Sequence, residues 1–117
     1  MISVNLKNIR MSDGVLSHGG GTIKITVRGH SGYGSLGGDI VCAGISAVIQ
    51  TGILGIIRVA RVKQRLKKRK GYLESVIDVR KNDDEAMKGL LIILTTVVLG
   101  LEEINKAYPG SVEIIYS

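Results

Sequence analysis

The sequence contains few of the residues on which several functional classes depend. It has no tryptophan or phenylalanine, and its aromatic side chains are four tyrosines. A protein that binds single-stranded nucleic acid by stacking bases on aromatic side chains is therefore disfavoured. The one cysteine, Cys42, cannot form a disulfide within the chain, which fits a reducing compartment. One cysteine and two histidines do not complete a zinc site, and we expect no metal or cofactor.

Length and composition favour one folded domain, which we place at residues 1–117. The net charge is +6, but eight of the sixteen basic residues lie between Arg58 and Lys70, where there is no acid. The rest of the chain carries eight basic and ten acidic residues, a balance of −2. Such a basic stripe indicates either a solvated strand surface or a contact with RNA. The residues that could contact RNA are Arg61, Lys63, Arg65 and Lys67.

No membrane or secretory segment is expected. The N-terminal sequence MISVNLKNIR alternates apolar and polar residues and lacks the long apolar run of a signal peptide. Residues 40–57 form an uncharged stretch of 18 residues, at the short limit for a transmembrane helix. Polar residues interrupt this stretch, and strand periodicity around it favours a soluble sheet.

The first half of the chain predicts two strands and a helix. Apolar and polar residues alternate at 2–7 and again at 22–28, the pattern of half-buried strands. Residues 10–21 contain four glycines and little periodicity, which indicates a long hairpin connection or an insertion. Residues 29–38 contain five glycines and predict a flexible loop. Asp39 is then a suitable N-cap for a helix over 40–57.

The second half predicts a hairpin, a helix and a last strand. Residues 60–79 pair with themselves around a loop at 68–71, with Leu66 opposite Leu73 and Arg65 opposite Glu74. Asn82 is the predicted N-cap of an apolar helix that ends near Ala107, and residues 112–116 form the last strand.

The resulting order is β-β-α-β-β-α-β. It predicts an α+β domain whose mainly antiparallel sheet has two helices on one face. The middle of the second helix, residues 90–99, is apolar almost all round. Such a helix is either enclosed in the core or shared with a second subunit, and the small size of the domain favours a homodimer.

Residues 29–46 carry the candidate chemistry. Gly32 to Gly37 satisfies the pattern G-x-G-x-x-G, but the chain is too short for a doubly wound sheet and basic side chains follow where an acidic one is required. A more specific combination is His30, the glycine loop and Cys42 in the first turn of the predicted helix. Unpaired N–H groups at a helix start and a nearby imidazolium both favour a thiolate, so the two residues could form a nucleophile and base pair.

Two segments resemble the signature of the ribosomal-processing cysteine protease family, Prp. They are GHSGY at 29–33 and GDIVCAGIS at 38–46. Gly71-Tyr72-Leu73-Glu74, the apolar second helix and Tyr108-Pro109 are also similar to that family, so the likeness spans nearly the whole chain except residues 10–21.

The resemblance implies a cytoplasmic, homodimeric endopeptidase. Its substrate would be the N-terminal extension of a large-subunit ribosomal protein, the one numbered twenty-seven, removed during ribosome assembly. Cys42 would be the nucleophile, His30 the general base, and Asp39 would assist them or serve only as the N-cap. Two other hypotheses stay open: a non-catalytic basic module that binds RNA or the ribosome, and a structural dimer in which Cys42 is inert.

Overall fold

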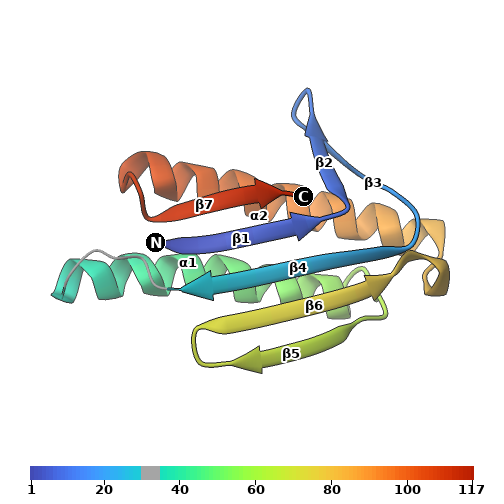
Figure 1. Ribbon diagram of the computed structural model, residues 1–117, viewed down its shortest axis with the longest axis horizontal. Coiled ribbons are helices and arrows are strands. Elements are labelled where there is room, and N and C mark those ends of the chain that lie inside the picture. The colour runs from blue at the N-terminus through green and yellow to red at the C-terminus, as the bar shows by residue number, and fades with distance from the viewer. Residues whose placement is uncertain (30–34) are drawn as a thin grey trace.

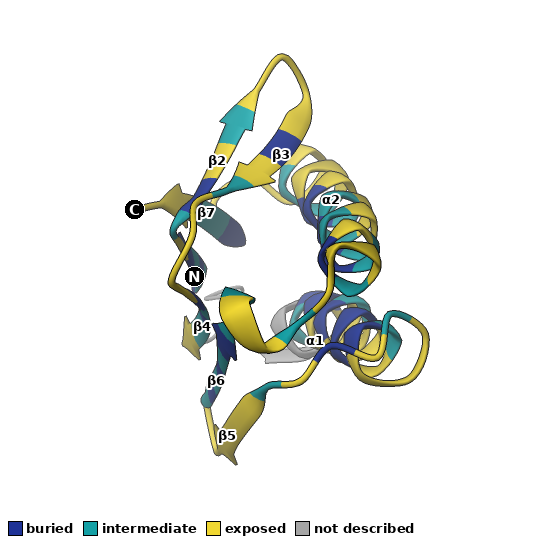
Figure 2. Cartoon of the chain, turned by 90° about the vertical axis from the view of Figure 1, so that its right-hand side faces the viewer, coloured by how far each residue is buried: buried dark blue, intermediate teal, exposed yellow. Residues whose placement is uncertain are grey.

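A computed structural model describes residues 1–29 and 35–117, with side chains from residue 40 onward in the second range. Its main sheet has the strand order β5-β6-β4-β1-β7, and every neighbouring pair is antiparallel except β1 with β7. Both helices lie on one face of this sheet (Figures 1 and 2). The elements are β1 (Ile2–Lys7), β2 (Ile9–Ser12), β3 (Val15–His18), β4 (Thr22–Gly29), α1 (Ser35–Arg58), β5 (Arg65–Arg69), β6 (Tyr72–Asp78), the short 3-10 helix η1 (Val79–Lys81), α2 (Asp84–Ala107) and β7 (Val112–Tyr116). The predicted fold class is confirmed.

The core lies between the sheet and the helix layer. Alternate residues of β1, β4 and β6 are buried, because successive side chains of a strand point to opposite faces. Leu6, Ile23 and Ile77 project from this face and are fully buried together with Ile45 of α1 and Leu90 of α2. The period-2 alternation of the sequence therefore correctly predicted which face of each strand the helices cover.

Residues 10–21 are more ordered than the sequence analysis predicted. Their first part belongs to a separate two-stranded sheet, in which Ile9 pairs with His18 and Ser12 with Val15. Asp13 and Gly14 connect the two strands, and both have positive φ, 50° and 74°. Two such residues form the turn that matches the twist of a hairpin. The predicted order β-β-α-β-β-α-β thus holds for the main sheet, with this hairpin inserted between its first two strands.

Helix α1 begins earlier than predicted, at Ser35. Asp39 lies inside the helix, so its prediction as the N-cap was wrong. Cys42 lies about two turns into the helix rather than in its first turn. The glycines at 37 and 38 favoured a loop because each costs about 1 kcal/mol relative to alanine in a helix, but this propensity did not decide the outcome.

Part of α1 also has the composition of a membrane span. The stretch Ile40–Arg58 is long and apolar enough to cross a membrane, and 33% of its most apolar part is buried inside the fold. Core helices that pack on a sheet meet the same criteria of length and composition, and α1 packs here against both the sheet and α2.

The β5–β6 hairpin has a different register from the predicted one. Lys67, rather than Arg65, is opposite Glu74, and Leu66 is opposite Ser75. The loop is shorter than predicted because Gly71, at φ 70°, closes a tight turn directly after Lys70. A shift by two residues keeps every side chain on its predicted face, so only the pairing was wrong.

The N-cap of α2 is Asp83, whose Oδ1 accepts a hydrogen bond of 2.8 Å from the backbone N–H of Ala86. Asn82, predicted as this cap, instead joins two chain segments. Its Oδ1 accepts from the backbone N–H of Lys63 at 2.7 Å and its Nδ2 donates to the Lys63 carbonyl at 3.2 Å. The predicted end of the helix is confirmed, since α2 stops at Ala107, just before Pro109.

Candidate active site

A cleft of about 410 Å³ lies between α1 and the end of the sheet where β4 stops and the β5–β6 hairpin turns. Cys42 is half-buried in its α1 wall, one turn before Ser46 and two turns before Gln50 on the same side. Gly29 and Gly71 line the opposite wall at the ends of the strands. The chain's one thiol is therefore in a cavity large enough to admit part of a peptide.

The cleft has an apolar interior and a basic rim. Its apolar lining comes from both layers and consists of Ile2, Val27, Ala43, Ile45, Ile49 and Leu73. Arg28, Lys68 and Arg69 supply the charge, and none of the described residues that line the cleft is acidic. This arrangement suits a ligand that places an apolar side chain inside the cleft and polar or negatively charged groups at its rim.

Tyr72 lies between two arginines at the mouth of the cleft. The guanidinium carbons of Arg28 and Arg69 are 5.1 Å and 4.7 Å from the centre of its ring, close enough for cation–π attraction on both sides. The Tyr72 hydroxyl donates a hydrogen bond to the Glu74 carboxylate, and Lys24 forms an ion pair with Glu74 at 3.4 Å. These contacts connect the hairpin to β4.

The same contacts determine the electrostatics of Glu74. The hydrogen bond from the Tyr72 hydroxyl is the main reason that the pKa of Glu74 lies below its usual value of 4.5. Lys24 lowers this pKa further, whereas partial loss of hydration raises it. Glu74 is thus stabilised as a carboxylate beside a cleft in which the charged residues that the structure describes are basic.

A second set of polar contacts connects the hairpin to α1. Lys68 Nζ donates to Gln50 Oε1 at 3.5 Å, and Gln50 Nε2 donates to Ser46 Oγ at 2.8 Å. Among the described residues of α1 that line the cleft, Ser46 supplies the other hydroxyl or thiol. Cys42 is the better candidate nucleophile, because a thiol ionises more readily than a hydroxyl and its thiolate is a strong nucleophile.

Of the three predicted catalytic residues, the structure describes Cys42 in full, Asp39 in its backbone, and His30 not at all. Cys42 lines the cleft, whereas His30 lies outside the described residues. Asp39 belongs to α1, and its side chain is also outside the description. Because the dipole effect falls off within the first turn, the argument that a helix start activates Cys42 does not apply to this position. Within the described part of the chain, no three His, Cys, Asp or Glu side chains gather as metal ligands.

Three of the four residues predicted to contact RNA lie close together, and Arg61 lies elsewhere. Arg65 and Lys67 belong to β5, and Lys63 lines a cavity beside the start of that strand. Arg61 lies in the turn after α1 and lines a different cavity, together with Asp83. The sequence analysis also did not identify Tyr72 and Arg28 as part of the cleft; the Gly-Tyr at the hairpin turn, noted for its resemblance, was the available signal.

Comparisons with known proteins identify the family of this chain. A family model described as cysteine protease Prp matches residues 9–113. The ribosomal processing cysteine protease Prp of Staphylococcus aureus is 30% identical over 93 residues, which cover 79% of this chain and 84% of that protein.

Solved structures show a similar fold. A structure of the Staphylococcus aureus protease Prp with a covalently linked product peptide has a TM-score of 0.72 at 26% identity, with full coverage of both chains. A second structure, with a substrate peptide, has a TM-score of 0.70 at 22% identity, again with full coverage. With the match over residues 9–113 and the thiol of Cys42 in the cleft, the chain belongs to the cysteine protease Prp family and is a cysteine-type peptidase.

Proposed function

We propose that this peptidase removes the N-terminal extension of a large-subunit ribosomal protein, the one numbered twenty-seven, during ribosome assembly in the cytoplasm. The observation that carries the proposal is the position of Cys42 in the wall of a cleft with an apolar interior. The Staphylococcus aureus relative supports it, because its name describes ribosomal processing and its structures hold substrate and product peptides.

The proposed reaction begins with the thiolate of Cys42. Its sulfur attacks the carbonyl carbon of the scissile peptide bond, and the carbonyl oxygen becomes an oxyanion in a tetrahedral intermediate. When the C–N bond breaks, protonated His30 gives its proton to the leaving amine, which departs as the new N-terminus of the ribosomal protein. The extension stays bound to Cys42 as a thioester.

Water completes the cycle. His30, now neutral, takes a proton from a water molecule as the oxygen attacks the thioester carbonyl. The C–S bond breaks, the extension leaves with a new carboxylate, and the thiolate of Cys42 is restored beside protonated His30. Asp39 would assist by orienting the imidazole or stabilising its charge. These roles of His30 and Asp39 are carried over from the family resemblance.

The shape of the cleft suggests which part of the substrate lies beside the thiol. Ile45 and Leu73 face the cleft from its two layers, so an apolar or aromatic residue of the extension would be buried next to Cys42. Arg28 and Arg69 at the rim would contact peptide carbonyls or a carboxylate.

We also propose that the protein works as a homodimer through the outer side of its helix layer. A groove of about 590 Å³ runs between α1 and α2, lined almost entirely by small and aliphatic residues. Large apolar side chains around the helices are exposed, among them Leu54, Val59, Ile92 and Leu99. A second copy that covers this surface would bury them.

Cleavage of a synthetic peptide that contains the extension and its junction tests the catalytic proposal. We expect Cys42→Ala to remove cleavage while circular dichroism and melting temperature stay near those of the wild type, because alanine is a good helix former. Mass spectrometry of a briefly mixed wild-type sample should show the extension attached to the protein through a hydroxylamine-sensitive bond, and the variant should show none.

Ser46→Ala supplies the comparison, since Ser46 is the other candidate nucleophile of α1 in the cleft. A peptide that is still cut by Cys42→Ala but not by Ser46→Ala would show that the thiol is not the nucleophile. Loss of cleavage in Cys42→Ala together with retention of the thioester in Ser46→Ala supports the proposal.

A further inference from the structure

The face of the sheet opposite the helices carries three successive strands of polar side chains. Residues directly opposite one another on neighbouring strands share a face, so β4, β6 and β5 form transverse rows. The rows are Arg28–Tyr72–Arg69, Thr26–Glu74–Lys67, Lys24–Val76–Arg65 and, without β5, Thr22–Asp78. The residues between them, such as Ile25 and Leu73, are buried toward the helices. The rows therefore lie on the helix-free face, which Figure 2 shows uncovered.

This face, which we call the basic face, has a surplus of positive charge. Its rows hold five basic residues, namely Lys24, Arg28, Arg65, Lys67 and Arg69, and two acidic ones, Glu74 and Asp78. Both acids are already engaged: Lys24 is 3.4 Å from Glu74, and Arg80 Nε is 3.4 Å from Asp78. The remaining four basic residues form no ion pair with any carboxylate in the described part of the chain.

A cavity of about 360 Å³ lies at the end of the basic face that is remote from the Cys42 cleft. Its basic lining residues are Lys63, Arg65 and Lys81, and Thr22 adds a hydroxyl. Asp78 is the acid of the lining, and Arg80 balances its charge through hydrogen bonds to Oδ1 from the backbone N–H at 3.0 Å and from Nε.

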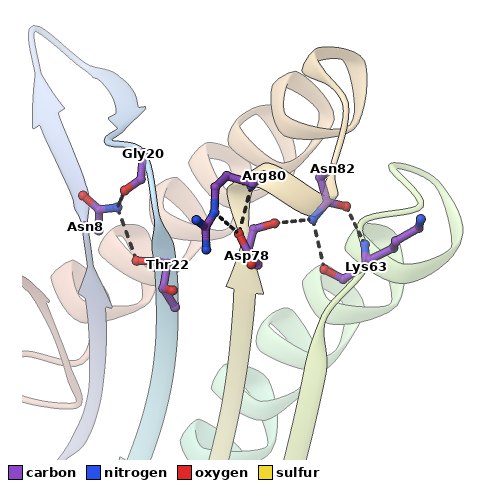
Figure 3. A network of polar contacts seen from close by, with 7 residues as sticks. All are labelled: Asn8, Gly20, Thr22, Lys63, Asp78, Arg80 and Asn82. Atoms are coloured by element: carbon purple, nitrogen blue, oxygen red, sulfur yellow. Dashed lines mark hydrogen bonds and ion pairs between the residues drawn. The ribbon is translucent and has the colours of Figure 1, made fainter.

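The walls of this cavity are held in place by a network of polar contacts (Figure 3). Asn82 bonds to both backbone groups of Lys63 and donates from Nδ2 to the Asp78 carbonyl at 3.0 Å. Asn8 Nδ2 donates to the carbonyls of Gly20 and Thr22 at 2.9 Å and 3.3 Å. Basic side chains around a concave surface, with a hydroxyl donor among them, suit the charge and the hydrogen-bond acceptors of a phosphate group, and the cavity has room for one.

We propose that the basic face binds single-stranded RNA, with one backbone phosphate in the cavity lined by Lys63, Arg65 and Lys81. From Arg28 to Thr22 the face extends about 20 Å, enough for several nucleotides. Arg65 and Lys67 belong to this surface and Lys63 lines the cavity at its end, so three of the four residues identified from the sequence contribute. The pairing with β4 adds Lys24 and Arg28.

RNA fits the surface better than an acidic peptide does. Arg28 and Arg69 cover the two sides of the Tyr72 ring, and the outer planes of their guanidinium groups can stack on bases. The aromatic ring itself is already covered, so phosphate contacts would dominate and binding would depend little on base sequence. The face ends at the peptidase cleft, because Arg28 and Arg69 belong to both, so RNA bound here would lie beside the cleft.

Fluorescence anisotropy with a short labelled single-stranded RNA of mixed sequence, at several KCl concentrations, tests the proposal. We expect the wild type to bind, with a negative slope when the logarithm of the association constant is plotted against the logarithm of the KCl concentration. The affinity of Arg65→Gln/Lys67→Gln should be at least about tenfold lower. Each lost phosphate contact should reduce the slope by about 0.7. The matched control is Arg58→Gln/Lys88→Gln, which removes the same charges from exposed positions on the helices and should leave the affinity near that of the wild type.

Several outcomes would overturn the proposal. These are no binding at low salt, an equal loss in both double variants, or competition by a polyglutamate peptide as effective as that by unlabelled RNA of equal charge, which would indicate a site for acidic proteins. The peptidase is assayed in parallel so that the two proposals fail separately. Cys42→Ala should bind RNA normally, and Arg65→Gln/Lys67→Gln should still cleave the peptide, since neither residue lines the Cys42 cleft.

Discussion

Gly52 of α1 packs directly against Val97 of α2, because a Cβ built on Gly52 would lie only 2.4 Å from Val97 Cγ2. Valine is stiff about χ1 and cannot easily move away from such a contact. We predict that Gly52→Ala lowers the free energy of unfolding by about 1–3 kcal/mol from overpacking, offset in part by about 1 kcal/mol of helix propensity. Urea denaturation of both proteins measures the difference.

Gly44→Ala is the control for this prediction, since a Cβ on Gly44 would meet nothing within 4 Å. Only the gain in helix propensity remains there, so we expect this variant to be more stable than the wild type by up to about 1 kcal/mol. Opposite signs for the two substitutions support a close contact between the helices at Gly52. Equal stabilisation of both would contradict it.

A second prediction concerns acid stability near the mouth of the cleft. The hydroxyl of Tyr72 is the main cause that holds the pKa of Glu74 below its usual 4.5. Because the folded pKa is below the unfolded one, this contribution to stability is present above pH 4.5 and is lost as pH falls through the folded value. Tyr72→Phe should therefore raise the pKa of Glu74 and weaken the dependence of stability on pH below 4.5.

Carbon-detected NMR of the Glu74 carboxylate across this pH range measures the shift. Tyr108→Phe is the matched control, because it makes the same change at the end of α2 and should leave the titration of Glu74 as in the wild type. An unchanged pKa in Tyr72→Phe would mean that the hydroxyl does not bond to Glu74 in solution.

The sequence predicted the faces of the strands better than their pairing. Alternation at Ile2, Val4 and Leu6 directly reflects burial, and these residues are buried as expected. The β5–β6 register was wrong by two residues because charge pairing does not discriminate strongly: Glu74 meets a basic residue whether Arg65 or Lys67 is opposite. The turn geometry at Gly71 decided between them.

The candidate site could be predicted from the sequence only where neighbouring residues form a recognisable motif. The motif around Cys42 indicated a nucleophile, and that residue does line the cleft. The start of α1 was not predictable, because the glycines before Asp39 have low helix propensity and yet lie within the helix. The basic face also depends on tertiary structure, since Lys24 joins Arg65 only when β6 pairs with both of their strands.

A third prediction tests the dimer. Ile92 on α2 is 69% exposed, so glutamate there would cost little in a monomer but would place a charge in the proposed interface. We expect sedimentation to give a dimer for the wild type and a monomer for Ile92→Glu. Val15→Glu, a change at a 64% exposed residue of the β2–β3 hairpin, should remain dimeric. Equal masses for all three proteins would place the interface elsewhere or exclude it.

The last prediction separates a catalytic histidine from a structural one. If His30 is the general base, His30→Ala should lower kcat by about 10²–10⁴-fold while the melting temperature changes little, because the imidazole contributes to proton transfer rather than to packing. The other histidine, His18, lies on β3, where its Nδ1 is 2.9 Å from the Gly19 carbonyl oxygen. His18→Ala is therefore the matched control, and its kcat should equal that of the wild type.

Steady-state kinetics with the extension peptide and thermal melts of the same preparations give both quantities. A loss of activity in His30→Ala that only follows a loss of folded protein would mean that His30 supports the fold and that another group moves the proton. An equal loss of kcat in His18→Ala would point to a general effect of histidine removal. Only a large, selective loss of kcat at unchanged stability assigns the base to His30, since a missing proton acceptor slows the chemical step without removing buried contacts.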